Sequence, residues 1–144
     1  MLKSILITGA ATGLGRATAL KLAEQGHQLT VVDFNEVEGQ NTVNMAIELG
    51  AEAIFVKADV SNEEQVKNYV AKAIEAFGKI DVFFNNAGLM VPFRLIHEYD
   101  ENEFDRIMNV IVKGAFFGVK YVLPHMIENG GGTIVNTVSS NSYK

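Results

Sequence analysis

Hydrophobic and polar positions follow two different periods along the chain. Short runs rich in β-branched and aromatic residues predict buried strands at residues 4–8, 29–33, 53–58, 80–85 and 133–138. The segments between them have helical length and spacing, at about residues 14–25, 36–49, 62–77 and 101–128. Strands that alternate with helices form right-handed βαβ units around a parallel sheet. We therefore expect an α/β fold, a three-layer doubly wound parallel sheet, in a single domain over residues 1–144.

Local signals indicate where the first three helices begin and end. Ser61 and Glu64 have the spacing of a capping box, so Ser61 is the expected N-cap of the third helix. Gly26, Gly50 and Gly78 are expected to end the three helices in turn, because glycine adopts the left-handed conformation found after a helix.

The last helical segment, 101–128, is apolar on nearly all sides. Its apolar residues include Ile111, Val112, Ala115, Phe116, Phe117, Val119, Tyr121 and Leu123. A helix of this kind must be buried on two sides, and the sheet covers only one of them. The run at 133–138 would also form an unpaired apolar edge strand. We therefore expect the chain as given to be incomplete, oligomeric or both.

Composition and charge exclude several classes of function. Of the 144 residues, 48% are apolar and 20% are charged, which is typical of a globular protein. The net charge is −5 and there is no basic stretch, which argues against nucleic acid and anionic membranes as partners. The absence of cysteine excludes thiolate catalysis and fits a cytoplasmic location. The three histidines lack metal-ligand spacing, and we expect no signal peptide and no membrane span.

A glycine-rich loop between the first strand and the first helix is the strongest local signal. It reads TGAATGLG, with Gly9, Gly13 and Gly15 in the spacing Gly-x-x-x-Gly-x-Gly. Gly9 permits a tight turn, Gly13 leaves room for a pyrophosphate and Gly15 allows the helix to pack closely on the sheet. The N–H groups of the helix N-terminus would then face phosphate groups. The loop is not a P-loop, because no Gly-Lys-Ser/Thr sequence follows it.

Asp33 ends the second strand, twenty residues after Gly13. A carboxylate at this position accepts hydrogen bonds from both hydroxyls of an adenosine ribose and repels a 2′-phosphate. Phe34 follows, and no neighbouring lysine or arginine is present to neutralise such a phosphate. The alternative is an aspartate that caps the next helix, but the position favours ribose binding and NAD over NADP.

Five motifs in order make the chain resemble the N-terminal part of the short-chain dehydrogenases/reductases: TGAATGLG, VVD, ADVS at 58–61, NNAG at 85–88 and GGGTIVNTVSS. The resemblance implies a Rossmann-type fold, incomplete at its C-terminus, and a cofactor-binding role for Gly9, Thr12, Gly13, Leu14, Gly15, Asp33, Asp59, Val60, Asn86, Ala87 and Gly88. It also implies that the asparagines tie neighbouring strands together.

The resemblance identifies Ser139 as the catalytic serine, because family members end this strand with Asn-x-x-Ser and Ser139 is the third residue after Asn136. Ser140 is the next candidate, and both hydroxyls could instead satisfy loop backbone groups. The family's catalytic Tyr-x-x-x-Lys has no counterpart here. Tyr143 is only four residues beyond Ser139, so it is expected to be an ordinary loop residue.

A second departure from the family pattern lies in the last helical segment. Alignment on Val112-Lys113-Gly114 places Ile111 where the family has an asparagine that supports a proton relay. Asn109 is two residues away, about 200° around a helix, and is expected to face elsewhere. Either the relay is built differently in this protein or it is impaired.

Three functions remain open at this stage. The first is an NAD-dependent oxidoreductase that transfers a hydride between nicotinamide and a small alcohol or ketone, with the tyrosine and lysine beyond Lys144. The second is a non-catalytic NAD-binding fragment or pseudoenzyme, which Ile111 favours. The third is an interaction module that uses the apolar helix, which leaves the cofactor motifs unexplained. The resemblance further implies a homodimer or homotetramer, while the substrate itself stays undetermined.

Overall fold

The computed structural model describes residues 1–92 and 94–139; Phe93, Ser140, Tyr143 and Lys144 lie outside the described residues. Its sheet has five strands in the order β3-β2-β1-β4-β5, and each neighbouring pair is parallel. The strands are β1 (Ser4–Thr8), β2 (Gln28–Asp33), β3 (Ala53–Lys57), β4 (Val82–Asn85) and β5 (Thr133–Asn136). The predicted parallel sheet is confirmed, with strand ends that differ by up to two residues.

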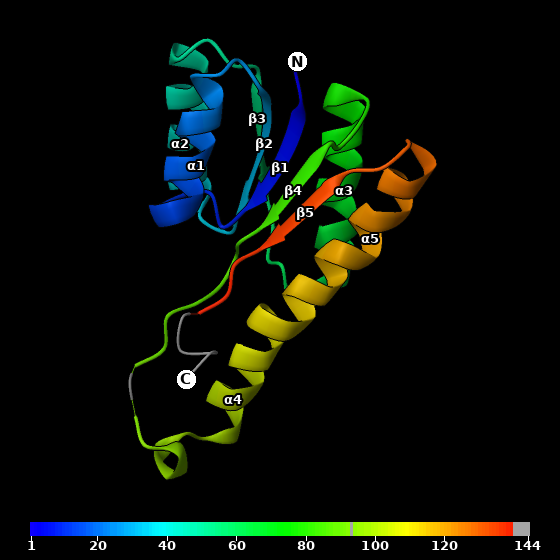
Figure 1. Ribbon diagram of the computed structural model, residues 1–144. Coiled ribbons are helices and arrows are strands. Elements are labelled where there is room, and N and C mark those ends of the chain that lie inside the picture. Colours follow the sequence, from blue (N-terminus) through cyan, green and yellow to red (C-terminus); the bar gives the residue numbers. More distant parts are fainter. Residues whose placement is uncertain (93, 140–144) are drawn as a thin grey trace.

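Helices cover both faces of this sheet (Figure 1). On one face lie α1 (Gly13–Ala23) and α2 (Glu36–Glu48), and on the other lie α3 (Glu63–Phe77) and α5 (Gly114–Glu128). Two buried clusters result: one around Ile7, Val31 and Val43, and the other around Leu6, Phe83 and Val122. Alternate residues of β1 therefore pack into the clusters on opposite faces of the sheet, as expected for a strand covered on both faces. The three-layer Rossmann-type fold is confirmed.

The strand order reverses between β1 and β4. From β1 the chain adds β2 and β3 on one side, and then returns to add β4 and β5 on the other side. In open parallel sheets the crevice at such a switch point, outside the carboxyl ends of the strands, is where ligands bind. The loops that follow β1, β2, β3 and β4 meet at this edge.

The third helix begins one residue later than predicted. The N-cap of α3 is Asn62, whose side chain accepts a hydrogen bond from the Gln65 N–H at 3.1 Å. Ser61 is therefore wrong as the N-cap. The reason is that both its N–H and its hydroxyl donate to the Asp59 carboxylate, at 2.9 and 2.7 Å, so its side chain belongs to the preceding turn.

The last helical segment is continuous but not uniform. It comprises α4 (Glu101–Ile107), a π-helical stretch (Met108–Lys113) and α5, and a short 3₁₀ turn (Ile96–Glu98) precedes it. Sequence periodicity predicted one helical segment over 101–128 and gave no signal for the π-helical stretch or the 3₁₀ turn. A π-helical stretch shifts the helix register, so the directions of the following side chains differ from those of a regular helix.

One face of this segment is buried and the opposite face is exposed. Gly114, Gly118, Val122 and Met126 form the buried face. A Cβ at Gly118 would lie 2.7 Å from the Phe83 ring, so α5 packs closely on the sheet. We call the exposed apolar residues on the other side the apolar stripe: Phe104, Met108, Val112, Phe116, Leu123 and Ile127. The prediction that the sheet covers only one side of this helix is confirmed.

The expectation that no segment reaches the length of a membrane span is wrong. Within the described residues, Glu101–Glu128 is long and apolar enough to cross a bilayer, although that judgement uses only length and composition. The core helix of a soluble protein passes the same test, so the finding is weak evidence for a span. The buried face of α5 packs against α3 and the sheet instead.

Candidate functional site

Two cavities of about 490 and 450 Å³ lie at the switch point. They share Gly9, Asp33, Phe34, Gly88 and Leu89, so they form one continuous groove. The eleven residues assigned to the cofactor from the sequence all line it: Gly9, Thr12, Gly13, Leu14, Gly15, Asp33, Asp59, Val60, Asn86, Ala87 and Gly88. The fold therefore brings together residues from four separate loops.

The turn after β1 requires glycine at three positions, at Gly9 and Gly13 because φ is positive and at Gly15 because the turn is so close. Gly9 has a φ of +66°, and a Cβ there would lie 2.8 Å from the Ala87 Cα. A Cβ at Gly15 would lie 2.1 Å from the Gly9 carbonyl oxygen, so the start of α1 packs on the turn itself. This corrects the expectation that Gly15 packs on the sheet. At Gly13 no atom lies within 4 Å of an added Cβ, which leaves this part of the groove open.

The N-terminus of α1 faces this open part of the groove. Its N-cap, Thr12, makes no side-chain capping bond, and the first turn contains no acidic residue. The N–H groups of a first turn lack partners within the helix and carry partial positive charge. This end of α1 can therefore bind an anionic group.

Asp33 occupies the centre of the groove. One carboxylate oxygen accepts the Ala11 N–H and the other accepts the Asn35 N–H, each at 3.0 Å. These bonds fix the orientation of the carboxylate. Because each carboxylate oxygen can accept more than one hydrogen bond, Asp33 can still accept from two hydroxyl donors.

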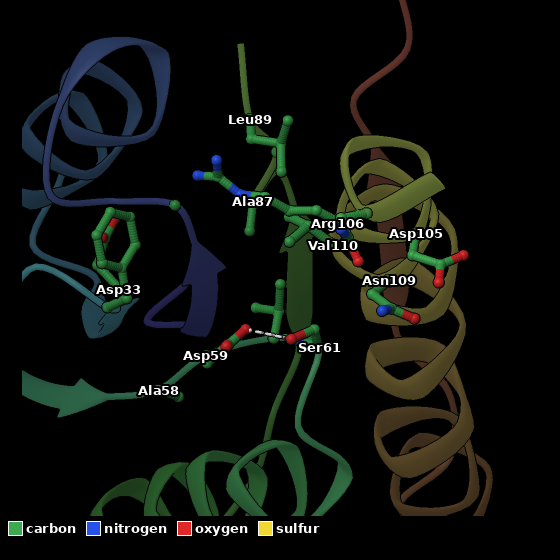
Figure 2. Close-up of a pocket in the computed structure, with 15 residues that line it drawn as sticks. Asp33, Ala58, Asp59, Ser61, Ala87, Leu89, Asp105, Arg106, Asn109 and Val110 are labelled. Atoms are coloured by element: carbon green, nitrogen blue, oxygen red, sulfur yellow. Dashed lines mark hydrogen bonds between the residues drawn. The ribbon is translucent and has the colours of Figure 1, made fainter. Parts of the chain in front are cut away.

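Beside Asp33, the larger cavity is lined by both apolar and polar residues. Ala58, Val60 and Val110 supply apolar surface. Asp59 lies at the rim, where its carboxylate accepts from Ser61 (Figure 2). A flat, partly apolar group with polar edges, such as a purine, matches this combination.

A hydrogen-bond network links the carboxyl ends of β1, β4 and β5. The buried Thr8 hydroxyl accepts the N–H groups of Asn86 and Ala87, each at 3.0 Å. The Asn86 amide donates to the Thr8 carbonyl at 3.1 Å and accepts from the Thr137 hydroxyl at 2.9 Å. The asparagines thus connect neighbouring strands, and the segment that lines the groove after β4 is held rigidly.

Asn85 makes the second part of this network. Its side-chain amide donates to the Asn136 side chain at 3.0 Å and to the Ala115 carbonyl at 3.1 Å. The Thr137 N–H donates to the Asn85 carbonyl at 3.1 Å. Ser139 is exposed and follows this anchored segment, three residues beyond the end of β5, outside the lining of the two cavities.

Sequence reasoning missed the residues that α4 and the π-helical stretch contribute. Asn102, Asp105, Arg106 and Asn109 line the larger cavity. Their only sequence signal is a polar character within a largely apolar segment, and their meeting with Asp33 depends on tertiary structure. Ile111 lies outside the cavity lining and is exposed, so Asn109 and Ile111 face different directions, as predicted.

The chain is similar to proteins of one family along almost its whole length. Residues 3–144 match the family model described as short chain dehydrogenase. An uncharacterized oxidoreductase of Thermotoga maritima is 42% identical over 138 residues, which are 95% of this chain and 53% of that protein. Levodione reductase of Leifsonia aquatica is 41% identical over 94% of this chain and 51% of its own length.

A solved structure gives the same picture. The crystal structure of NAD⁺-bound xylitol dehydrogenase has a TM-score of 0.95 and 39% identity, over 99% of this chain and 55% of that one. The chain spans about half the length of the curated relatives that it matches.

Proposed function

The chain belongs to the short-chain dehydrogenase family, and on this premise we propose that residues 1–144 form the NAD-binding domain of an oxidoreductase acting on an alcohol or carbonyl substrate. The observation that carries the proposal is the groove, in which a glycine turn, a helix N-terminus and the Asp33 carboxylate meet at the switch point. Glycine at positions 9 and 15 shapes a cradle that larger residues would fill.

Each part of the groove takes one part of the dinucleotide. Gly13 and the first turn of α1 hold the diphosphate, and Asp33 accepts the two hydroxyls of the adenosine ribose. Asp59 and Val60 hold the adenine, while Asn86, Ala87 and Gly88 line the path toward the nicotinamide. When bound, the nicotinamide supplies or accepts the hydride that is exchanged with a substrate carbon.

Asp33 also carries the preference for NAD over NADP. A 2′-phosphate would replace a hydrogen-bond donor with a dianion beside the carboxylate, and like charges at contact repel strongly in a partly enclosed site. The two backbone N–H groups that bind Asp33 hold it in place, so it cannot easily turn away.

Ser139 is the proposed catalytic residue of this chain, with the role of holding the substrate oxygen while the hydride moves. Its support is its position two residues after Thr137, which hydrogen bonds to Asn85 and Asn86 hold beside the groove. The proton step needs the family's tyrosine and lysine, which the 144 residues do not supply. The whole activity is therefore a property of the longer protein that we propose.

One observation favours a second function, a non-catalytic NAD binder. Ile111 stands where the family has the asparagine of its proton relay, and this apolar side chain cannot hold a water there. A pseudoenzyme would bind NAD with the same groove but transfer no hydride.

We also propose that the protein is a cytoplasmic homodimer or homotetramer. The apolar stripe supports the association, because a row of exposed apolar side chains along one helical segment indicates a surface that a partner covers. In a dimer with a two-fold axis, each copy contributes the same surface, so the stripe of one copy would cover the stripe of the other.

Hydride transfer by the purified whole protein tests the proposal. With NAD⁺ and a panel of small secondary alcohols, we expect formation of reduced nicotinamide, measured by its absorbance. Ser139→Ala should lower kcat by about 100-fold or more, while the Kd for NAD⁺ stays unchanged. NAD⁺ binding without turnover on any alcohol or ketone would support the pseudoenzyme, and lack of NAD⁺ binding would reject both.

A further inference from the structure

Arg106 is the one cation among the described residues that line the groove. The other charged lining residues are Asp33, Asp59 and Asp105. A lining with three carboxylates and a single guanidinium is net negative, although a dinucleotide brings two anionic phosphates into it. The charge of Arg106 therefore decides how well the groove accepts an anion.

The two other arginines of the chain already have carboxylate partners. Arg16 contacts Glu38 at 2.5 Å and also donates to Thr42, and Arg94 contacts Glu103 at 2.6 Å. The Arg106 side chain makes no hydrogen bond or ion pair with another described residue, even though Asp105 is adjacent in sequence. Arg16, which lies in the first turns of α1 and is nearest in sequence to the glycine loop, is thus already paired and lies outside the groove lining.

The direction of the Arg106 side chain matters as much as its charge. Figure 2 shows it leaving α4 and crossing the groove above Ala87, so that its guanidinium points toward the side occupied by Asp33. The residue remains exposed, so the guanidinium is accessible from solvent. The two helical turns around it, by contrast, present Asp105 and Asn109 along the wall of the cavity (Figure 2).

We propose that Arg106 binds the phosphate oxygens of the dinucleotide. A guanidinium carries paired N–H donors in a fixed plane and binds phosphate through two parallel hydrogen bonds. The N-terminus of α1 supplies about half a unit charge, which leaves most of the phosphate charge to be balanced by another group. The expected partner is the diphosphate bridge that NAD and NADP share, and the 2′-phosphate that NADP alone carries is the competing outcome of the test. This assignment rests on the proposed function.

Three variants of the whole protein test it, with the Kd for NAD⁺ and for NADP⁺ measured by calorimetry at low and at high salt. Arg106→Gln removes the charge and leaves a shorter polar side chain, and we expect its Kd to rise about tenfold, as for the loss of one charged hydrogen-bond pair. Arg106→Lys keeps the positive charge but lacks the paired N–H donors of a guanidinium, so it should retain only part of the affinity. Arg94→Gln is the matched control, since it removes an equal charge from a residue outside the groove lining.

The pattern across the two cofactors identifies the phosphate. An equal loss for NAD⁺ and NADP⁺, smaller at high salt, assigns Arg106 to the diphosphate, whereas a loss for NADP⁺ alone assigns it to the 2′-phosphate. Unchanged binding in Arg106→Gln, or an equal loss in Arg94→Gln, would overturn the assignment and leave the proposed function intact. A wild-type protein that binds neither dinucleotide would overturn both.

Discussion

The two sides of the switch point differ in how completely they bury their own apolar surface. On the first side all five residues of β1 and four of the six of β2 are buried, and α1 and α2 cover them. On the second side three of the four residues of β5 are exposed, and the apolar stripe lies open along α4 and α5. The first side holds the glycine turn and Asp33, whereas the second side carries Ser139 after β5.

This difference separates binding from chemistry. The cofactor groove is shaped by contacts within the described residues, such as the approach of Gly9 to Ala87 and the bonds to Asp33. The surroundings of Ser139 depend on whatever covers β5 and the apolar stripe. We therefore expect substitutions in the glycine turn after β1 to act on cofactor binding, and substitutions in the apolar stripe to act on assembly.

The largest effect is expected at Gly15. Gly15→Ala places a methyl group 2.1 Å from the Gly9 carbonyl oxygen, so the turn must open. Overpacking of this kind costs about 1–3 kcal/mol, and the open turn no longer holds a diphosphate. We expect a lower Tm and complete loss of dinucleotide binding in a titration.

Gly26→Ala is the matched control for that experiment. Gly26 lies three residues beyond the end of α1, has a φ of +73° and has open space at its Cβ position. Its added methyl group should meet no clash, so the only cost is the strain of a left-handed backbone, about 1 kcal/mol, with dinucleotide binding unchanged. If Gly15→Ala and Gly26→Ala change the Tm and dinucleotide binding equally, a clash with the Gly9 carbonyl oxygen does not explain why the turn needs Gly15.

The next effect concerns the apolar stripe. Phe116→Glu introduces a charge into the surface that we propose a second copy covers, and burial of an unpaired carboxylate is costly. Sedimentation velocity should show monomers, with a dimer Kd at least about 100-fold weaker. Ile47→Glu changes an equally exposed apolar residue on α2 and should leave the assembly unchanged. Wild-type protein that is monomeric at all concentrations would contradict the proposal.

A smaller effect is expected at Asn85, whose side chain links β4 to β5 and to α5. Asn85→Ala removes the bonds to Asn136 and to the Ala115 carbonyl. The loss should lower the free energy of unfolding by about 1–3 kcal/mol, because partners in a part-buried site stay unsatisfied. Chemical denaturation measures it. Gln40→Ala, which removes only an exposed bond to Asn44 within α2, is the control and should change stability little.

The smallest effect is a pH dependence at the contact between α3 and α5. Hydrogen bonds from Lys120 and then Tyr121 hold the pKa of Glu63 below its ordinary value. A lowered folded-state pKa contributes stability above the unfolded-state pKa, and this contribution is lost as the pH falls through the folded-state value. Glu63→Gln should therefore lower the Tm slightly at neutral pH and not at strongly acidic pH. Glu75→Gln, which breaks the Glu75–Lys72 pair within α3, provides the comparison.

The fold and most of the groove could be predicted because their signals are local. Strand runs, helix spacing and the glycine loop each lie within one short stretch of sequence, and parallel strands bring the following loops to one edge. Arg106 could not be predicted in this way, since it reaches the groove from a helix more than seventy residues after Asp33. The N-cap at Asn62 was missed because the Asp59–Ser61 turn competes for the serine hydroxyl.

The account depends most on Asp33 as the group that binds an unmodified ribose. Calorimetric titration of the whole protein with NAD⁺ and NADP⁺, in wild type and Asp33→Asn, tests this directly. Two hydrogen bonds to a carboxylate predict NAD⁺ binding at least about tenfold tighter than NADP⁺ binding, and Asp33→Asn should abolish most of that ratio. Equal binding of the two cofactors by the wild type, or a ratio unchanged in Asp33→Asn, would contradict the account.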